Sequence, residues 1–122
     1  MMRLSRVEME ELVQRALEEL PDEFAALLDN VAVLVEDEPS DDDLESVGMA
    51  RDEEDELFGL YVGVPLTERG ASWDGFPDQI KIFSGPIGRF ARNRREAIRE
   101  IRDTVIHELG HFFGMEEDQM PY

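Results

Sequence analysis

The chain has 122 residues, of which 42% are hydrophobic and 34% are charged. This length and balance are typical of a small globular protein, and we expect residues 1–122 to form a single domain. The 30 acidic residues against 12 basic ones give a net charge of −18. Such a charge disfavours binding to nucleic acid and to anionic membranes, so we expect neither as a partner.

The absence of cysteine and of long apolar runs limits which metal ligands and which cellular location can be expected. The chain contains no cysteine, which excludes disulfides and thiolate ligands, so any metal must be held by nitrogen and oxygen. No apolar run reaches the roughly 18 residues that a membrane span needs, and the first residues lack the apolar stretch of a secretory signal. A cytoplasmic location is therefore expected.

A helix and a strand are predicted near the start of the chain. Ser5 and Glu8 have the spacing of a capping box, and apolar residues recur with helical spacing over residues 6–20. Pro21 ends this helix. The β-branched apolar run at residues 31–35 then predicts a buried strand.

Residues 36–56 form an acidic stretch with few apolar side chains, interrupted by Pro39 and Gly48. A segment of this composition buries little apolar surface, and we expect it to be a solvated, mobile loop. The alternative is an acidic surface that binds a basic protein partner or loosely held cations.

Two strands and a long helix are predicted in the second half. Strand-like runs at 57–64 and 79–83 are separated by an irregular loop. Glycines at 59 and 63 in the first run indicate a bulge or the close approach of another backbone. Residues 94–113 form the longest segment of helical periodicity, closed by Gly114.

The candidate site is in residues 107–111, which read His-Glu-Leu-Gly-His within the predicted long helix. Positions i and i+4 lie on one helix face, so His107 and His111, the only 2 histidines of the chain, can bind one metal ion. Glu108 is rotated by about 100° from His107, beside the ion, where its carboxylate can act as general base toward water. The spacing predicts a zinc site of the metallopeptidase kind.

A third metal ligand is expected shortly after the second histidine. Gly114 lets the chain leave the helix and fold back toward the metal. Three positions further lies Glu117, the expected ligand, with Asp118 as a competitor and Glu116 as a weaker one. These nitrogen and oxygen ligands would hold one Zn²⁺ per chain, and the carboxylate also admits other divalent cations.

The segment from His107 to Glu117 resembles the extended zinc signature of metzincins, with an acidic residue in place of the usual third histidine. The chain looks more closely like the small bacterial zincin-like metallopeptidases, the minimal-zincin family. Further segments resemble strand segments of that family, at residues 30–36, 57–61, 64–69 and 80–86. The resemblance thus covers most of the chain outside the acidic stretch.

This resemblance implies an α+β, minimal zincin-like fold, in which a short mixed sheet packs on helices and the long C-terminal helix carries the motif beneath it. It implies His107, His111 and Glu117 as metal ligands and Glu108 as the catalytic base. The implied reaction is hydrolysis of a peptide bond in a peptide or protein substrate, by a peptidase or amidase.

Other interpretations remain open. The protein could use the metal only for stability or regulation, or it could be an interaction module whose acidic stretch captures a basic partner. The strand at 79–83 is expected at a sheet edge beside the site, where an extended peptide could pair with it. Tyr61 or Tyr122 could supply an oxyanion donor, although packing is the commoner role.

The arginines between residues 89 and 102 also have two interpretations. At i,i+3 and i,i+4 spacing they can pair with acidic residues of the same helix. Alternatively they can bind a substrate carboxylate, an acidic partner or the acidic stretch at 36–56.

Overall fold

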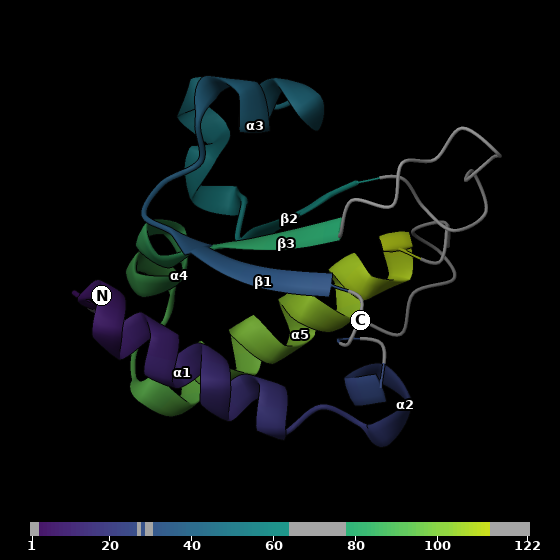
Figure 1. The fold of residues 1–122 in the computed structure, drawn as a ribbon. Helices are drawn as coiled ribbons and strands as arrows, with labels where there is room; N and C mark the ends of the chain where they lie inside the picture. The colour runs from purple at the N-terminus through teal and green to yellow at the C-terminus, as the bar shows by residue number, and fades with distance from the viewer. Residues whose placement is uncertain (1–2, 27, 29–30, 64–77, 113–122) are drawn as a thin grey trace, which may run out of the picture.

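The computed structural model describes residues 3–26, 28, 31–63 and 78–112. The elements are α1 (Arg6–Glu18), α2 (Asp22–Ala25), β1 (Val31–Glu36), α3 (Asp41–Ser46), the 3-10 helix η2 (Arg51–Glu56), β2 (Gly59–Val62), β3 (Asp78–Phe83), α4 (Ser84–Phe90) and α5 (Arg94–Phe112). They form a small α+β architecture with a mixed sheet and a long helix α5 beneath it (Figure 1). The predicted fold class is confirmed.

The strands form a sheet of order β1-β3-β2, in which β1 runs parallel and β2 antiparallel to β3. Ile80 of β3 is paired with Val33 on one side and Tyr61 on the other. The expected edge position of residues 79–83 is therefore wrong. Both faces of β3 are covered, as in a central strand, because Ile80 and Phe83 are 0% exposed on opposite faces. Among the strands that the structure describes, the edge strand above α5 is β2.

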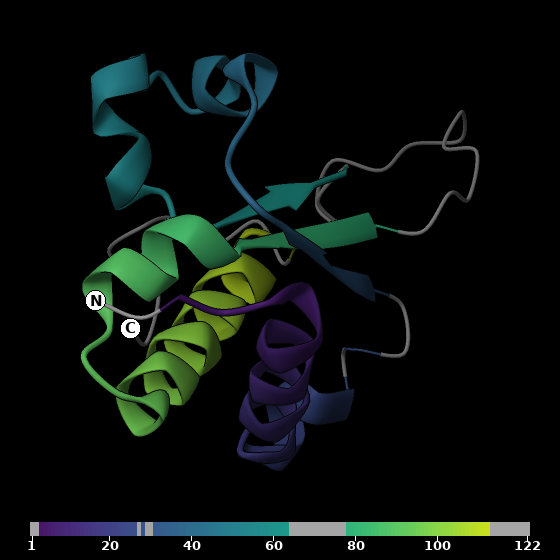
Figure 2. The ribbon, with the colours of Figure 1, turned by 90° about the vertical axis from the view of Figure 1, so that its left-hand side faces the viewer.

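The main core lies between the sheet and the two helices on one of its faces, α1 and α5 (Figure 2). Met9 and Leu12 of α1, Ile80 of β3, and Ile101 and Val105 of α5 are 0–1% exposed. Burial of each such side chain contributes roughly 1.5–3 kcal/mol. This packing holds α5 in one position and rotation beneath the strands.

Side-chain caps determine where the two core helices begin. Ser5 and Glu8 form the predicted capping box of α1, with both hydrogen bonds at 3.1 Å. At the start of α5, Oδ1 of Asn93 accepts a 2.8 Å hydrogen bond from the amide of Glu96. Arg92 pairs with the Glu96 carboxylate at 3.1 Å, which is the i,i+4 pairing predicted for arginines of this region.

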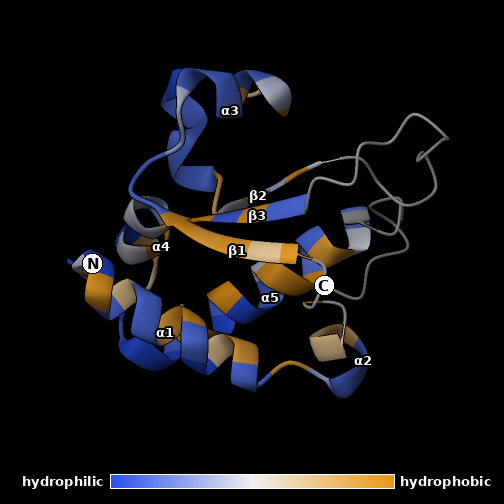
Figure 3. Ribbon diagram, viewed as in Figure 1, coloured by the Kyte–Doolittle hydropathy of each residue, from blue (hydrophilic) through white to orange (hydrophobic). Residues whose placement is uncertain are grey.

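The acidic stretch at 36–56 contains two short helices, α3 and η2, so the expectation of a loop there is wrong. Both helices are hydrophilic and lie on the sheet face opposite to α5 (Figure 3). Ser40 and Asp43 form a capping box at the start of α3, with hydrogen bonds of 2.9 and 3.0 Å. Leu44 packs with Leu57 and Phe83 in a second, smaller apolar cluster.

Basic residues from distant parts of the chain attach the acidic stretch to the sheet and to α4. Nζ of Lys81 lies 3.0 Å from Oδ1 of Asp43. The guanidinium of Arg89 binds both Glu38 and Asp55, at 2.7 Å each, and these bonds, first of all those to Glu38, raise the pKa of Arg89. Long-range ion pairs therefore supply contacts that apolar side chains of this stretch are too few to supply.

Among the helices of the described residues, none has the length and apolar character of a membrane span.

Candidate metal centre

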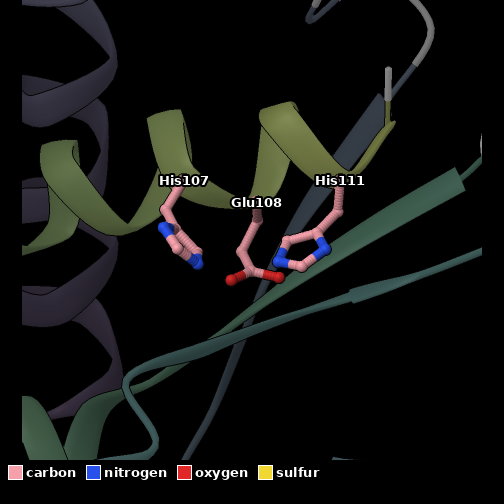
Figure 4. Close-up of side chains that lie close together, drawn as sticks. All are labelled: His107, Glu108 and His111. Carbon is pink, nitrogen blue, oxygen red and sulfur yellow. The ribbon is translucent and has the colours of Figure 1, made fainter. Parts of the chain in front are cut away.

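Helix α5 carries His107, Glu108 and His111, the three predicted site residues that the structure describes. Val105 and Leu109 of this helix are 0% exposed and set its rotation against the core. His107, Glu108 and His111 leave the same side of the helix, toward the strands (Figure 4). Glu108 is 9% exposed, and the two histidines are half-buried.

The three side chains converge on one point. One ligand atom from each of His107, Glu108 and His111 lies within 4.8 Å of the others. The imidazole centroids are 5.2 Å apart with an interplanar angle of 65°, and the carboxylate lies between the two rings (Figure 4). Imidazole nitrogens and carboxylate oxygens, without thiolates, are ligands that zinc accepts. The two imidazoles therefore fit a zinc ion or a similar divalent cation, with the Glu108 carboxylate close beside it.

Strand β2 supplies a hydrogen bond to the carboxylate of Glu108. The main-chain N–H of Tyr61 donates to Oε1 of Glu108 at 2.7 Å. The Tyr61 hydroxyl donates to Oδ2 of Asp78 at 2.9 Å, and Asp78 is 2% exposed. This side-chain bond connects β2 to β3, and it favours a packing role for Tyr61 over that of an oxyanion donor.

Gly59 allows β2 to lie close to α5. A Cβ at this position would overlap Cγ2 of Thr104 and would lie 3.0 Å from the carbonyl oxygen of Lys81. The sequence predicted a bulge or the close approach of another backbone here; the nearby backbone is the Lys81 carbonyl of β3, and α5 approaches through the Thr104 side chain. Because β2 approaches α5 here, the amide of Tyr61, two residues further, reaches Glu108.

A groove of about 490 Å³ opens beside the motif residues. One wall consists of residues 56–59, which link η2 to β2, and the other of Asp103, Thr104, His107 and Glu108 of α5. Its volume is within the range of about 300–1,000 Å³ that is typical of ligand sites. A substrate at the candidate metal centre would therefore have a hollow beside it.

Several predicted residues lie outside the described residues. They include the expected third ligand Glu117, its competitors Glu116 and Asp118, and Tyr122. Conversely, the contact between the amide of Tyr61 and Glu108 was not predicted from the sequence. A main-chain donor has no signature in residue type, and only the glycines at 59 and 63 indicated a close approach in this part of the chain.

The fold and the His-Glu-His group define a small α+β protein with a candidate metal centre on helix α5. The chain belongs to the zincin-like metallopeptidase family, whose model matches residues 28–122. This match confirms the family resemblance, and the family implies a metal ion, usually zinc, in agreement with the donor set. No curated protein matches the chain significantly.

Proposed function

We propose that this protein is a zinc-dependent peptidase or amidase that hydrolyses a peptide bond in a peptide or protein substrate. His107, His111 and Glu117 hold one zinc ion per chain, and Glu108 is the general base. The observation that carries the proposal is the convergence of the three motif side chains within 4.8 Å, in a chain of the zincin-like metallopeptidase family. Zinc, when bound, supplies Lewis acidity toward water and the substrate carbonyl.

In this proposal Glu108 transfers the proton. Its carboxylate accepts a proton from the attacking water while the water oxygen bonds to the carbonyl carbon of the substrate. It then delivers that proton to the amide nitrogen as the C–N bond breaks. The hydrogen bond from Tyr61 holds Oε1 in place, which supports a fixed position of the base during both transfers.

The outer edge of β2 is the place where an extended substrate would pair. The N–H of Phe83 donates to the carbonyl of Phe58 at 2.9 Å, so alternate residues of β2, Gly59 and Tyr61, direct their main-chain groups to the opposite edge. From that edge the Tyr61 amide reaches Glu108. Because the Tyr61 amide is bound to Glu108, a peptide added at this edge would pair with Gly59, next to the base. The sequence had predicted this role for residues 79–83, which form the central strand β3 instead.

The acidic stretch is a weaker candidate for a functional site. Part of its charge is matched within the chain, because Arg89 binds Glu38 and Asp55 and Arg51 binds Asp41. Binding of a basic protein partner to the remaining exposed acids stays a prediction. It would appear as salt-sensitive association that does not depend on zinc.

Metal analysis combined with peptide hydrolysis tests the proposed function. The purified protein should contain close to one zinc per chain, and His107→Ala should lose it. Glu108→Gln should retain zinc while hydrolysis of a broad peptide library falls by at least about 100-fold, the contribution of a positioned base. Glu10→Gln, an exposed change of the same kind on α1, is the control and should behave as the wild type.

Two results would contradict the proposal. Zinc binding without any hydrolysis that depends on Glu108 would favour a metal used for stability or regulation. If the protein takes up no zinc, both the peptidase proposal and a zinc ion used for stability or regulation are excluded.

A further inference from the structure

We propose that the groove beside the metal centre binds a substrate side chain with an aliphatic stem and a positive charge at its end, as in lysine or arginine. The inference rests on the proposed peptidase function and adds a substrate class to it. The groove is formed by residues 56–59 and by α5, and it has half-buried walls and two carboxylates among its lining residues.

Contacts between β2 and α5 show how the groove runs. Tyr61 contacts Glu108, and the backbone of Gly59 lies against Thr104, so the two walls run in the same direction. Toward lower residue numbers, one wall ends at Glu56 and the other at Asp103. The reacting centre is thus at one end of the groove, and two carboxylates are at the other.

The length of the groove matches a long side chain. Asp103 and His107 are one turn apart on α5, which corresponds to a rise of about 6 Å. The stem of an extended lysine or arginine side chain spans a similar distance and can lie along apolar surface while its charged end reaches further. A substrate residue at the metal centre could therefore place its cation between Glu56 and Asp103.

The middle of the groove is suited to the stem. Leu57 is 7% exposed, and Phe58 is half-buried, with its ring 5.3 Å from that of Phe90. On the opposite wall Thr104 is also half-buried. Phe58 and Thr104 offer surface that is already held in place by its neighbours, so little conformational freedom is lost when a stem binds.

The far end of the groove is suited to a cation. Glu56 is exposed, and among the described lining residues none is Lys or Arg. Asp103 pairs with the neighbouring Arg102 at 3.1 Å. Asp103 itself lines the groove, whereas Arg102 does not. The net charge of −18 adds a general attraction for cationic substrates.

A set of peptides with blocked ends tests the inference by hydrolysis. The residues beside the cleaved bond are varied in turn among lysine, arginine, norleucine and glutamate. Norleucine keeps the stem without the charge, and blocked ends exclude a free amino terminus as the cation. At one of the varied positions, we expect kcat/KM for the lysine and arginine peptides to exceed that for the norleucine peptide by about fivefold. This factor corresponds to two partly exposed ion pairs. The glutamate peptide should have the lowest kcat/KM.

Variants of the groove should change this selectivity specifically. In Glu56→Gln/Asp103→Asn the ratio of lysine to norleucine should fall to near one, because the lysine peptide loses its two charge partners. Glu56→Lys alone, a change at an exposed position, should reverse the preference toward glutamate. The control Glu10→Gln/Asp42→Asn removes the same two charges from exposed positions elsewhere and should keep the wild-type ratio.

Binding provides a readout that is independent of turnover. Fluorescence anisotropy of labelled lysine, norleucine and glutamate peptides is measured with Glu108→Gln, with and without Glu56→Gln/Asp103→Asn. Wild-type hydrolysis that depends on Glu108 but not on substrate charge would overturn the groove inference and leave the peptidase proposal intact. Lysine-selective binding through Glu56 and Asp103 without any hydrolysis would support the groove inference and overturn the peptidase proposal. If the protein shows neither selective binding nor hydrolysis, both the groove inference and the peptidase proposal are overturned.

Discussion

The main-chain amide of Tyr61 donates a 2.7 Å hydrogen bond to Oε1 of Glu108, a residue 47 positions further along the chain. This bond connects the edge strand β2 to the helix that carries the motif. A hydrogen bond to a charged group contributes about 1.5–3 kcal/mol. Residues that set the distance between β2 and α5 should therefore influence the candidate base without touching a metal ion. Gly59 is such a residue, whereas the hydroxyl of Tyr61 is not, because it binds Asp78 of β3.

Tyr61→Phe removes the hydroxyl that binds Asp78 but keeps the amide that binds Glu108. We expect the free energy of unfolding to fall by about 1–3 kcal/mol, because the buried Asp78 carboxylate loses one donor. The kcat value should not show the roughly 100- to 1,000-fold decrease that follows loss of an oxyanion donor. Urea denaturation and steady-state kinetics measure the two effects, and a decrease in kcat as large as that of Glu108→Gln would contradict the packing role.

Gly59→Ala should push β2 away from α5, because the new Cβ overlaps Cγ2 of Thr104. We expect a loss of about 1–3 kcal/mol in the free energy of unfolding, as for other overpacked sites. Hydrolysis should fall more than zinc content, since the change moves the donor to Glu108 and leaves the histidines in place. Adding Thr104→Ser removes the overlapping methyl group and should restore part of the stability; the absence of any restoration would show that the close approach is not the cause.

Glu117→Gln should weaken zinc binding by more than about 100-fold, because loss of a direct ligand should exceed the 10- to 100-fold effect of removing an outer-shell partner. Asp118→Asn is the matched control and should bind zinc nearly as well as the wild type. Competition with a chromophoric chelator measures both affinities. The opposite ranking would assign Asp118 as the ligand, and equal, unchanged affinities would exclude both.

The capping residue Asp43 should make stability depend on pH. Its burial acts to raise the pKa of Asp43, but hydrogen bonds from Ser40 and Lys81 outweigh this and lower it. A lowered folded-state pKa means that the stabilisation is fully present above the unfolded pKa of about 3.9 and is lost as the pH falls through the folded value. Asp43→Asn should thus cost about 1–3 kcal/mol at neutral pH.

Urea denaturation from pH 3 to 7 measures this dependence. The difference between the wild type and Asp43→Asn should be constant above about pH 5 and should shrink below about pH 4. Asp42→Asn, a change at the exposed neighbouring position, should follow the wild type at every pH. A difference that stayed constant down to pH 3 would show that Asp43 is not the titrating group.

Features that depend on local order along the chain could be predicted from the sequence alone. The capping box of Ser5 and Glu8 starts α1, and the apolar periodicity of 94–113 corresponds to α5. Because an α-helix repeats every 3.6 residues, the spacing of His107 and His111 was sufficient to place both rings on one side. The role of Glu117 as a ligand was also derived from the sequence and stays a prediction.

Features that depend on contacts between distant residues required the tertiary structure. Strand periodicity shows which side chains face the core but not which neighbour a strand pairs with, so the central position of β3 could not be read from residues 79–83. The acidic stretch is held by Lys81 and Arg89, whose partners lie 34 to 51 positions away. The amide of Tyr61 acts through the main chain, which is alike in nearly every residue, so its contact with Glu108 emerges only when β2 and α5 pack together.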